Sequence, residues 1–470
     1  MKMKSLIAVA GVAMLFCLGA SANDFQPIGY ESTAMGGAGV ASATGSMMGY
    51  YNPALLARAR GMEIGVTAGI GLDDKNMADK IRILNDLQLV NTLKTMNAEV
   101  TAQGGSFNGF SAGVKTNIDQ AIDLVIDAKN NGSSLKMQPN GGVGVQMGTF
   151  AVGVFGYGDE TATAFIPSGT DLTFKTAINV GGTNYDIIFL YNKTANTVSY
   201  NTFSPGTTTP VLPPTAGLAA TYNPSISAVG YGTNSLYEGV VVQKTDVIQI
   251  SGNAVTEIPI SLATSVKLPL LGSISIGASV KPMMGYTYSH TVDIDTKFQD
   301  VVDSFKDNET KSTALGIDVG AALDLPGINM ITIGIVGKNI NHPEFTDNTS
   351  AAQFKLDPLY RCGAAINITK GIKIAADYDL SANKDANGNA SRYLGGGISL
   401  DGGFFKLRGG AMQNIGLAGS DLLYTAGLSM GVKYINLNVA AVWDSNNTTT
   451  YDGKSYPNPT KVSVGLASRW

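Results

Sequence analysis

SISIGASVKPMMGYTYS, at residues 273–289, alternates between apolar and polar side chains over almost its whole length. Ile274 and Ile276 fall on one face, and Ser275 and Lys281 fall on the other. Successive side chains of a β-strand point to opposite faces, so this period of two predicts a strand with one apolar and one polar face. The strand would be far longer than the roughly 5 or 6 residues that are usual in globular proteins.

The same pattern recurs from residue 62 to the last residue, in pairs of candidate strands joined by very short connections. Short connections between two alternating runs are typical of β-hairpins. The number of candidate strands, fourteen, is even. They cover residues 62–72, 142–148, 152–158, 257–267, 273–289, 313–325, 330–339, 360–368, 372–380, 392–400, 404–412, 424–433, 437–443 and 461–470.

The connections alternate without exception between short and long. Bacterial outer-membrane barrels have short periplasmic turns and long external loops, whereas a soluble sandwich or propeller would give mixed lengths. We therefore predict an all-β protein: a transmembrane antiparallel up-and-down β-barrel of about 14 strands over residues 62–470, in contact with outer-membrane lipid. The long connections are 73–141, 159–256, 290–312, 340–359, 381–391, 413–423 and 444–460.

Charged residues of the candidate strands lie opposite the apolar face. In a membrane barrel that polar face lines the lumen. The charged residues predicted to face the lumen are Lys267, Lys281, Asp318, Lys338, Arg361, Lys373, Asp377, Lys406, Arg408 and Lys433.

The composition excludes several other classes of protein. Of the 470 residues 44% are hydrophobic, 14% are charged and 57 are glycine, which is not the composition of a disordered chain. The formal net charge is −4 and no cluster of Lys or Arg occurs, so nucleic acid is not expected as a partner. After the leader no run of about 20 apolar residues could form a membrane-spanning helix.

Residues 1–22 have the features of a secretory signal peptide. Lys2 and Lys4 precede an apolar run, and Ala20-Ser21-Ala22 supplies the small residues that precede a cleavage site. Export followed by insertion of a barrel predicts the bacterial outer membrane as the location. Cys362 would be the only cysteine after cleavage, which excludes an internal disulfide.

The last strand ends on an aromatic residue, Trp470, with apolar residues such as Leu466 at mostly every second position before it. This pattern is similar to the carboxy-terminal signal that the outer-membrane assembly machinery reads. Leu466 and Trp470 are therefore predicted as the assembly signal. The alternative is that Trp470 is an ordinary aromatic residue of the membrane boundary, like Trp443, Tyr424, Tyr286 and Tyr288.

Residues 23–61 do not alternate and are rich in Gly and Ala. A segment that precedes the first strand on the periplasmic side can fold up into the lumen, where small residues permit close packing and Pro53 fixes a bend. We name residues 23–61 the hatch. The alternative is that its Gly-rich part is a flexible linker.

Two motifs of the hatch, MGGAGVA at 35–41 and YYNPALL at 50–56, carry a family resemblance. They resemble the amino-terminal hatch of FadL-type outer-membrane transporters for long-chain fatty acids, which has a similar Gly/Ala run and an Asn-Pro-Ala motif. The chain looks still closer, along nearly its whole length, to the TraF-like outer-membrane proteins named for conjugal transfer. The resemblance implies gate residues in the hatch. The matching residues are Gly36, Gly37, Gly39, Asn52, Pro53 and Ala54.

The first long connection, 73–141, contains helical periodicity between residues 75 and 129. This external insert either caps the pore over an apolar ligand or packs only against itself and the barrel rim. The second long connection, 159–256, is predicted as an extracellular loop whose Thr/Pro/Asn-rich part, 195–235, lacks regular structure.

No catalytic or metal-binding constellation is complete. The sequence GLSMG at 427–431 matches a nucleophile motif, but it lies inside an alternating strand and no histidine follows it. His290 and His342 lack the companion ligands of a zinc site. We therefore predict a protein that is not an enzyme and that uses neither a metal nor a cofactor.

Three functions remain open at this point. The first is passive uptake of hydrophobic small molecules, fatty-acid-like or aromatic, past the hatch. The second is a non-transporting outer-membrane scaffold or accessory protein of secretion or conjugation. The third, a soluble exported protein of the thioredoxin-like kind that shares the TraF name, would need βαβ units where this chain has hairpins.

Overall fold

The structure is a computed structural model that describes residues 27–88, 111–164, 171–180, 183–192, 197–205, 248–268, 272–292, 309–325, 331–346, 352–384 and 390–470 (without 433, 445 and 459), with scattered positions in 91–102 and 207–242. The predicted signal peptide, 1–22, lies outside these residues. No described helix has the length and apolarity needed to cross a membrane.

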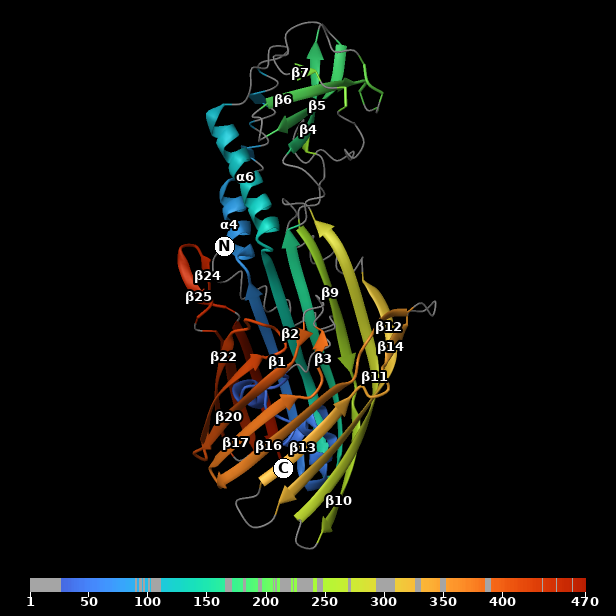
Figure 1. Ribbon diagram of the computed structural model, residues 1–470, viewed down its shortest axis with the longest axis vertical. Helices are drawn as coiled ribbons and strands as arrows, with labels where there is room; N and C mark the ends of the chain where they lie inside the picture. The colour runs from blue at the N-terminus through green and yellow to red at the C-terminus, as the bar shows by residue number, and fades with distance from the viewer. Residues whose placement is uncertain are drawn as a thin grey trace.

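One sheet of seventeen strands closes on itself as a barrel (Figure 1). Its strands pair antiparallel with their neighbours, and β1 pairs with β2 on one side and with β26 on the other. The sheet is formed by β1 (Met62–Asp74), β2 (Ser134–Met147), β3 (Phe150–Ala164), β9 (Ile248–Glu257), β10 (Ile260–Leu268), β11 (Gly272–Val292), β12 (Thr310–Leu325), β13 (Ile331–Lys338), β14 (Glu344–Thr346), β15 (Ala352–Lys355), β16 (Leu359–Thr369), β17 (Ile372–Asp379), β20 (Tyr393–Asp401), β21 (Phe405–Asn414), β22 (Leu422–Val432), β23 (Ile435–Trp443) and β26 (Thr460–Arg469).

These strands occupy fourteen positions around the wall. The strands β9 and β10 share one position, because both pair with β3 and with β11. The short strands β14 and β15 pair with each other above β13 and β16. The prediction of a 14-stranded antiparallel barrel is confirmed. The predicted strand 257–267 is longer than expected: it begins at Ile248 and is interrupted at residues 258–259, where Pro259 has no N–H to donate to a neighbouring strand.

The outer face of the barrel carries the apolar side chains of each strand. In β11, Ile274, Ile276 and Val280 are exposed, whereas Ser275 and Lys281 on the alternate positions are buried. Exposed Val, Leu and Ile residues recur on neighbouring strands, including Leu437 and Leu466, which pair across β23 and β26. A continuous apolar outer face on a closed barrel is the solvent contact of a lipid bilayer. The protein is an outer-membrane β-barrel.

Six of the charged residues predicted to face the lumen are buried inside the barrel: Lys281, Asp318, Lys338, Arg361, Asp377 and Arg408. Lys267 is exposed, near the end of β10, and Lys433 lies outside the described residues. One prediction about the aromatic residues is wrong. Tyr286 is buried and is not an exposed boundary residue, whereas Tyr424 is exposed and packs against Trp443 with ring centroids 6.5 Å apart.

The external connections hold more structure than predicted. The insert spans residues 75–133 rather than 73–141, because β1 and β2 extend into it, and contains helices α4 (Met77–Asp86) and α6 (Ala112–Asn130). The connection 159–256 is not a simple loop, because β3 and β9 take its ends and a separate sheet lies between them, beyond the helices (Figure 1). That sheet contains β4 (Asp171–Val180), β5 (Thr183–Asn192), β6 (Thr197–Phe203), β7 (Thr221–Tyr222) and β8 (Val240–Val242). The remaining short hairpins are β18 (Asn383–Lys384) with β19 (Ala390–Ser391), and β24 (Thr448–Tyr451) with β25 (Lys454–Pro457).

The described part of the hatch, residues 27–61, lies inside the barrel as the blue segment of Figure 1. It contains two short α-helices, α2 and α3, and two 3₁₀ helices, η1 and η2, and its core residues have almost no exposed surface. Their bounds are α2 (Tyr30–Ala34), η1 (Gly45–Met47), α3 (Met48–Tyr51) and η2 (Pro53–Arg58).

Replacing Ile276 by Arg tests the assignment of the outer face. A cation placed on the lipid face of a membrane barrel lowers the free energy of unfolding by about 2–4 kcal/mol near the midplane. We expect that loss for Ile276→Arg in lipid vesicles, measured by urea unfolding and heat-modifiable migration. Ile276→Leu is the control and should change little. Equal stability of the Arg and Leu variants would contradict a lipid-facing position.

Candidate functional site: the hatch and its seat in the wall

The hatch contains only short helices, so some of its backbone groups need partners from outside the segment. Lumen-facing wall residues supply many of them. Thr425 of β22 accepts a hydrogen bond from the Gly36 N–H (3.1 Å) and donates one to the Ala34 carbonyl (2.9 Å). On β26, Lys461 donates to the Pro27 carbonyl (3.1 Å). The hatch is therefore joined to the wall at several strands.

Gly36 and Gly37 form the turn that follows α2. Their φ angles are 65° and 83°, in the left-handed region that favours glycine. A Cβ atom on Gly36 would lie 2.2 Å from the Ala411 carbonyl oxygen and 2.6 Å from that of Gly396. A Cβ atom on Gly37 would meet only the Met412 sulfur, at 3.7 Å. Gly36 is thus fixed both by its conformation and by contact with the wall backbone.

The wall opposite this turn is also made of glycine. A Cβ atom on Gly395 would lie 2.0 Å from the Gly36 carbonyl oxygen, and one on Gly397 would lie 2.8 Å from the Met35 Cα. On the next strand, a Cβ atom on Gly410 would lie 2.9 Å from the Gly36 nitrogen. The sequence analysis did not identify these wall glycines as site residues. Because they lack a Cβ atom, the hatch backbone can touch the wall backbone, and we name these glycines the seat. Their signal in the sequence is the pair of runs GGG at 395–397 and GG at 409–410.

Gly39 lies at the next contact of the hatch with the wall. The Gly39 and Val40 N–H groups both donate to one carboxylate oxygen of Asp377, at 2.8 and 2.9 Å. Two backbone donors converging on one carboxylate make a charge-assisted contact. Asp377 was predicted to face the lumen, but its role as a hatch anchor could not be assigned from the sequence.

Asn52 is the most extensively bonded polar side chain of the hatch. Its amide nitrogen donates to the carbonyl oxygens of Val40 (2.9 Å) and, on the wall, Ala321 (3.2 Å) and Ile335 (3.4 Å). Its side-chain oxygen accepts from the Ala54 N–H (3.0 Å), which caps the start of η2. Asn52 is fully buried, so removing its amide would leave these partners without compensation from water.

Pro53 occupies the first position of η2, where its missing N–H is not needed. It rests on two further wall glycines. A Cβ atom on Gly277 would lie 2.5 Å from the Pro53 carbonyl carbon, and one on Gly320 would lie 2.0 Å from the Asn52 side-chain oxygen. The Asn-Pro-Ala motif docks on β11, β12 and β13, and the Gly36 turn docks on β20, β21 and β22. The structure brings both predicted motifs into one interface with the wall.

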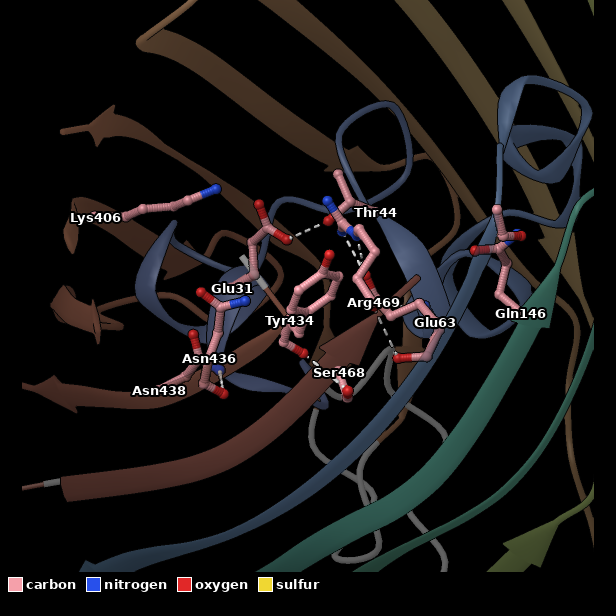
Figure 2. Close-up of polar contacts among 12 residues, drawn as sticks. Glu31, Thr44, Glu63, Gln146, Lys406, Tyr434, Asn436, Asn438, Ser468 and Arg469 are labelled. Atoms are coloured by element: carbon pink, nitrogen blue, oxygen red, sulfur yellow. Dashed lines mark hydrogen bonds and ion pairs between the residues drawn. The ribbon is translucent and has the colours of Figure 1, made fainter. Parts of the chain in front are cut away.

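Ion pairs surround the lower edge of the hatch. Arg58 binds Asp324 of β12 at 2.9 Å, and Arg469 of β26 donates to Glu63 at 2.8 Å. Figure 2 shows Glu31, Thr44, Glu63 and Arg469 close together, with Thr44 donating to Glu31 at 2.9 Å. The sequence did not identify Glu31 or Glu63 as site residues.

Glu31 interacts with two cations of the wall. Lys373 and Arg408 approach the same oxygen of its carboxylate, at 3.7 and 3.8 Å. Burial alone would raise the pKa of Glu31, but the charges of Lys373 and Arg408 and the hydrogen bond from Thr44 lower it to about 2. Glu31 is therefore ionised at neutral pH and holds α2 against β17 and β21.

The upper side of the hatch meets a buried group of charges. Lys281 lies 2.9 Å from both Glu257 and Asp318, and Lys338 lies 3.5 Å from Glu257. The Lys338 ammonium also stands 3.6 Å from the centroid of the Tyr50 ring, a cation–π contact with the hatch.

An apolar region occupies the lumen around and above Tyr50. The Tyr50 ring packs against Phe155 with centroids 5.2 Å apart. Phe345 and Phe354, on the β14–β15 hairpin, stack at 4.2 Å and lie against Gly285 of β11. We name this packed region the apolar cluster; it comprises Tyr50, Phe155, Tyr157, Val255, Met283, Phe345, Phe354 and Leu356.

Leu466 and Trp470, the predicted assembly signal, both lie on the exposed side of the last strand or its end. Trp470 exchanges two backbone hydrogen bonds with Met62, at 2.9 and 3.0 Å, and so closes the ring between the last strand and the first. Recognition by the assembly machinery stays a prediction.

Comparison with known proteins identifies the family. The family described as "F plasmid transfer operon, TraF, protein" matches residues 49–379, from the Asn-Pro-Ala motif to the end of β17. The chain belongs to this TraF family. The match includes Asn52, Pro53 and Ala54 but neither the Gly36 turn nor the last five wall strands of this TraF-family barrel. No curated protein matches the chain.

Solved structures similar to this TraF-family barrel include two named channels. The CymD monoaromatic hydrocarbon channel is 12% identical, with 94% of this chain and 97% of that chain covered at a TM-score of 0.45. The P. putida toluene transporter TodX is 10% identical, with 95% and 99% covered at a TM-score of 0.44.

The two glycines of the turn provide a matched pair of variants. An L-residue in the left-handed region costs about 1–2 kcal/mol, and overpacking adds about 1–3 kcal/mol. We expect Gly36→Ala to destabilise the docked hatch more than Gly37→Ala, because only Gly36 touches wall backbone. Protease sensitivity of residues 27–61 in the folded barrel measures this. Equal sensitivity of the two variants would contradict the seat.

Docking of α2 should weaken in acid. The pKa of Glu31 is about 2 in the folded protein and lies below its ordinary value of 4.5. Its contribution is therefore fully present above about pH 4.5 and is lost as the pH falls towards 2. The protection factors of residues 30–34 against hydrogen exchange should fall over this interval in the native protein. Glu31→Gln should exchange faster at neutral pH and lack this pH dependence; an unchanged pH profile in that variant would exclude Glu31 as the cause.

Proposed function

We propose that this barrel is an outer-membrane channel for the passive uptake of hydrophobic small molecules, fatty-acid-like or aromatic, gated by the hatch. The observation that carries the proposal is the apolar cluster in the lumen, which includes the hatch residue Tyr50. A cluster of aromatic and aliphatic side chains inside a barrel that also holds buried charges favours apolar ligands at that level. The gate residues are Gly36, Gly37, Gly39, Asn52, Pro53 and Ala54.

The hatch must move for a ligand to pass. Between the hatch and β1 the cavity lined by Ile28, Tyr51 and Ser46 has a volume of only about 20 Å³, about that of one water. A ligand that inserts among the side chains of the apolar cluster could use its binding free energy to shift the hatch from its seat, since a ligand moves an equilibrium only by its differential affinity for the two states. No metal, cofactor or catalytic step is part of this proposal.

The second candidate is a non-transporting scaffold or accessory protein of an envelope or conjugation machine. It is favoured by the family description, which names plasmid transfer, and by the many bonds that hold the hatch closed. The external helices α4 and α6 and the sheet β4–β8 would then serve as the surface for partners.

Uptake by whole cells separates the two candidates. Cells with the protein should accumulate a labelled long-chain fatty acid or alkylated aromatic compound faster than cells without it. Asn52→Leu, which removes the amide that joins hatch to wall, should change the uptake rate severalfold at an unchanged level of heat-modifiable barrel. The matched control is Asn438→Leu in β23, whose side-chain nitrogen donates to the wall carbonyls of Asn436 and Gly465 and to no hatch atom among the residues that the structure describes. Equal uptake with and without the protein would favour the scaffold.

A further inference from the structure

A cavity of about 150 Å³ lies below the hatch and is lined by the hatch and the wall. Among its lining residues five are basic and three are acidic, so the cavity carries an excess of positive charge. Figure 2 shows Glu31 with Lys406 extending towards it from the wall. The basic residues are Lys370, Lys373, Lys406, Arg408 and Arg469, and the acidic ones are Glu31, Glu63 and Asp401.

Two of the three acidic residues are already paired one to one. Asp401 binds Lys406 at 2.7 Å, and Glu63 binds Arg469. Glu31 is the third, and its single oxygen Oε1 is shared by Lys373 and Arg408 at distances too long for direct hydrogen bonds. Two cations therefore share the negative charge of one carboxylate.

Arg408 has unused donor capacity inside the protein. Its side chain is more than nine-tenths buried, and its Nε has no hydrogen-bond partner among the described residues. One terminal nitrogen donates to Ser429, and the guanidinium lies 5.8 Å from the centroid of the Tyr30 ring. A buried guanidinium with a free N–H is an arrangement that a carboxylate can complete with two parallel hydrogen bonds.

We propose that this cavity is a binding site for a small carboxylate, which takes the place of Glu31 between Lys373 and Arg408. In the structure the Glu31 carboxylate occupies this position. Lys373 and Arg408, which interact with it there, would bind the ligand carboxylate in the same way. A ligand carboxylate that replaces it releases α2 from β17 and β21, and binding and hatch release are then linked reciprocally. The inference does not require that the barrel transports.

Octanoate, acetate and octanol are the probes, titrated calorimetrically into the full-length barrel in a non-ionic detergent at pH 7. Octanoate should bind and octanol, which has the tail but no charge, should not bind at this site. Glu31→Gln should bind octanoate about five- to tenfold more tightly, because the internal competitor is gone. Lys373→Met should bind it at least tenfold more weakly. The control Lys454→Met removes one positive charge from an exposed external hairpin and should bind like the native protein.

Affinity for octanoate that does not rise in Glu31→Gln, or equal binding of octanoate and octanol, would overturn the proposal. The sign of the Glu31 effect separates ligand competition from a structural role, since structural damage alone lowers affinity, and it can be read even if Lys373→Met fails to fold. If both acetate and octanoate bind, the ligand is a free small carboxylate. If octanoate binds and acetate does not, the ligand is the carboxylate end of an apolar molecule. If cells with the protein fail to take up the labelled compound but Glu31→Gln still raises the affinity for octanoate, the channel proposal is rejected and the carboxylate site is retained.

Discussion

The hatch and the wall meet backbone to backbone, and this close approach depends on glycine on both sides. Gly36 could not carry a Cβ atom without meeting the carbonyl oxygens of β20 and β21, and Gly395 could not carry one without meeting Gly36. Hydrogen bonds then become possible between groups that side chains would otherwise hold apart. The bonds of Thr425 and Asp377 to hatch backbone follow from that proximity. The position of the Gly36 turn depends on it.

Two kinds of contact hold the hatch in the barrel. The glycine contacts and the Asn52 amide determine where the segment sits, because they depend on shape and on fixed backbone groups. The ion pairs of Glu31 and Arg58 with the wall lie at the lower edge and respond to charge in the surroundings. A close-packed interface changes between discrete arrangements rather than continuously, so the ionic edge is the part that solutes can influence without deforming the packed part.

The barrel could be predicted from the sequence because a period of two, repeated over hairpins with alternating connection lengths, leaves few other folds. The strand ends agree within a few residues for most strands, and the outward and inward faces were assigned from alternation alone. The sheet β4–β8 was missed because its strands lie in one long connection whose Thr/Pro/Asn-rich part resembles a loop. The break at Pro259 was missed because alternation resumes after it.

The hatch motifs were recognisable, but their partners were not. Gly36 and Thr425 are 389 residues apart, and Gly39 and Asp377 are 338 apart. Local periodicity says which wall residues face inward, but not the height at which a hatch residue meets them. The glycine runs at 395–397 and 409–410 were visible in the sequence; only the register of β20 with β21 shows that they form one surface.

The long separations in sequence also set an order of assembly. The hatch contacts β11, β12, β13, β17, β20, β21, β22 and β26, so the full set of contacts does not exist until the last strand has formed. Residues 27–61 leave the translocation machinery before any of these strands, yet they acquire their partners after all of them. Contacts between distant segments form late because their loop-closure entropy must be met first. Docking of the hatch is therefore completed only after the barrel has closed around it.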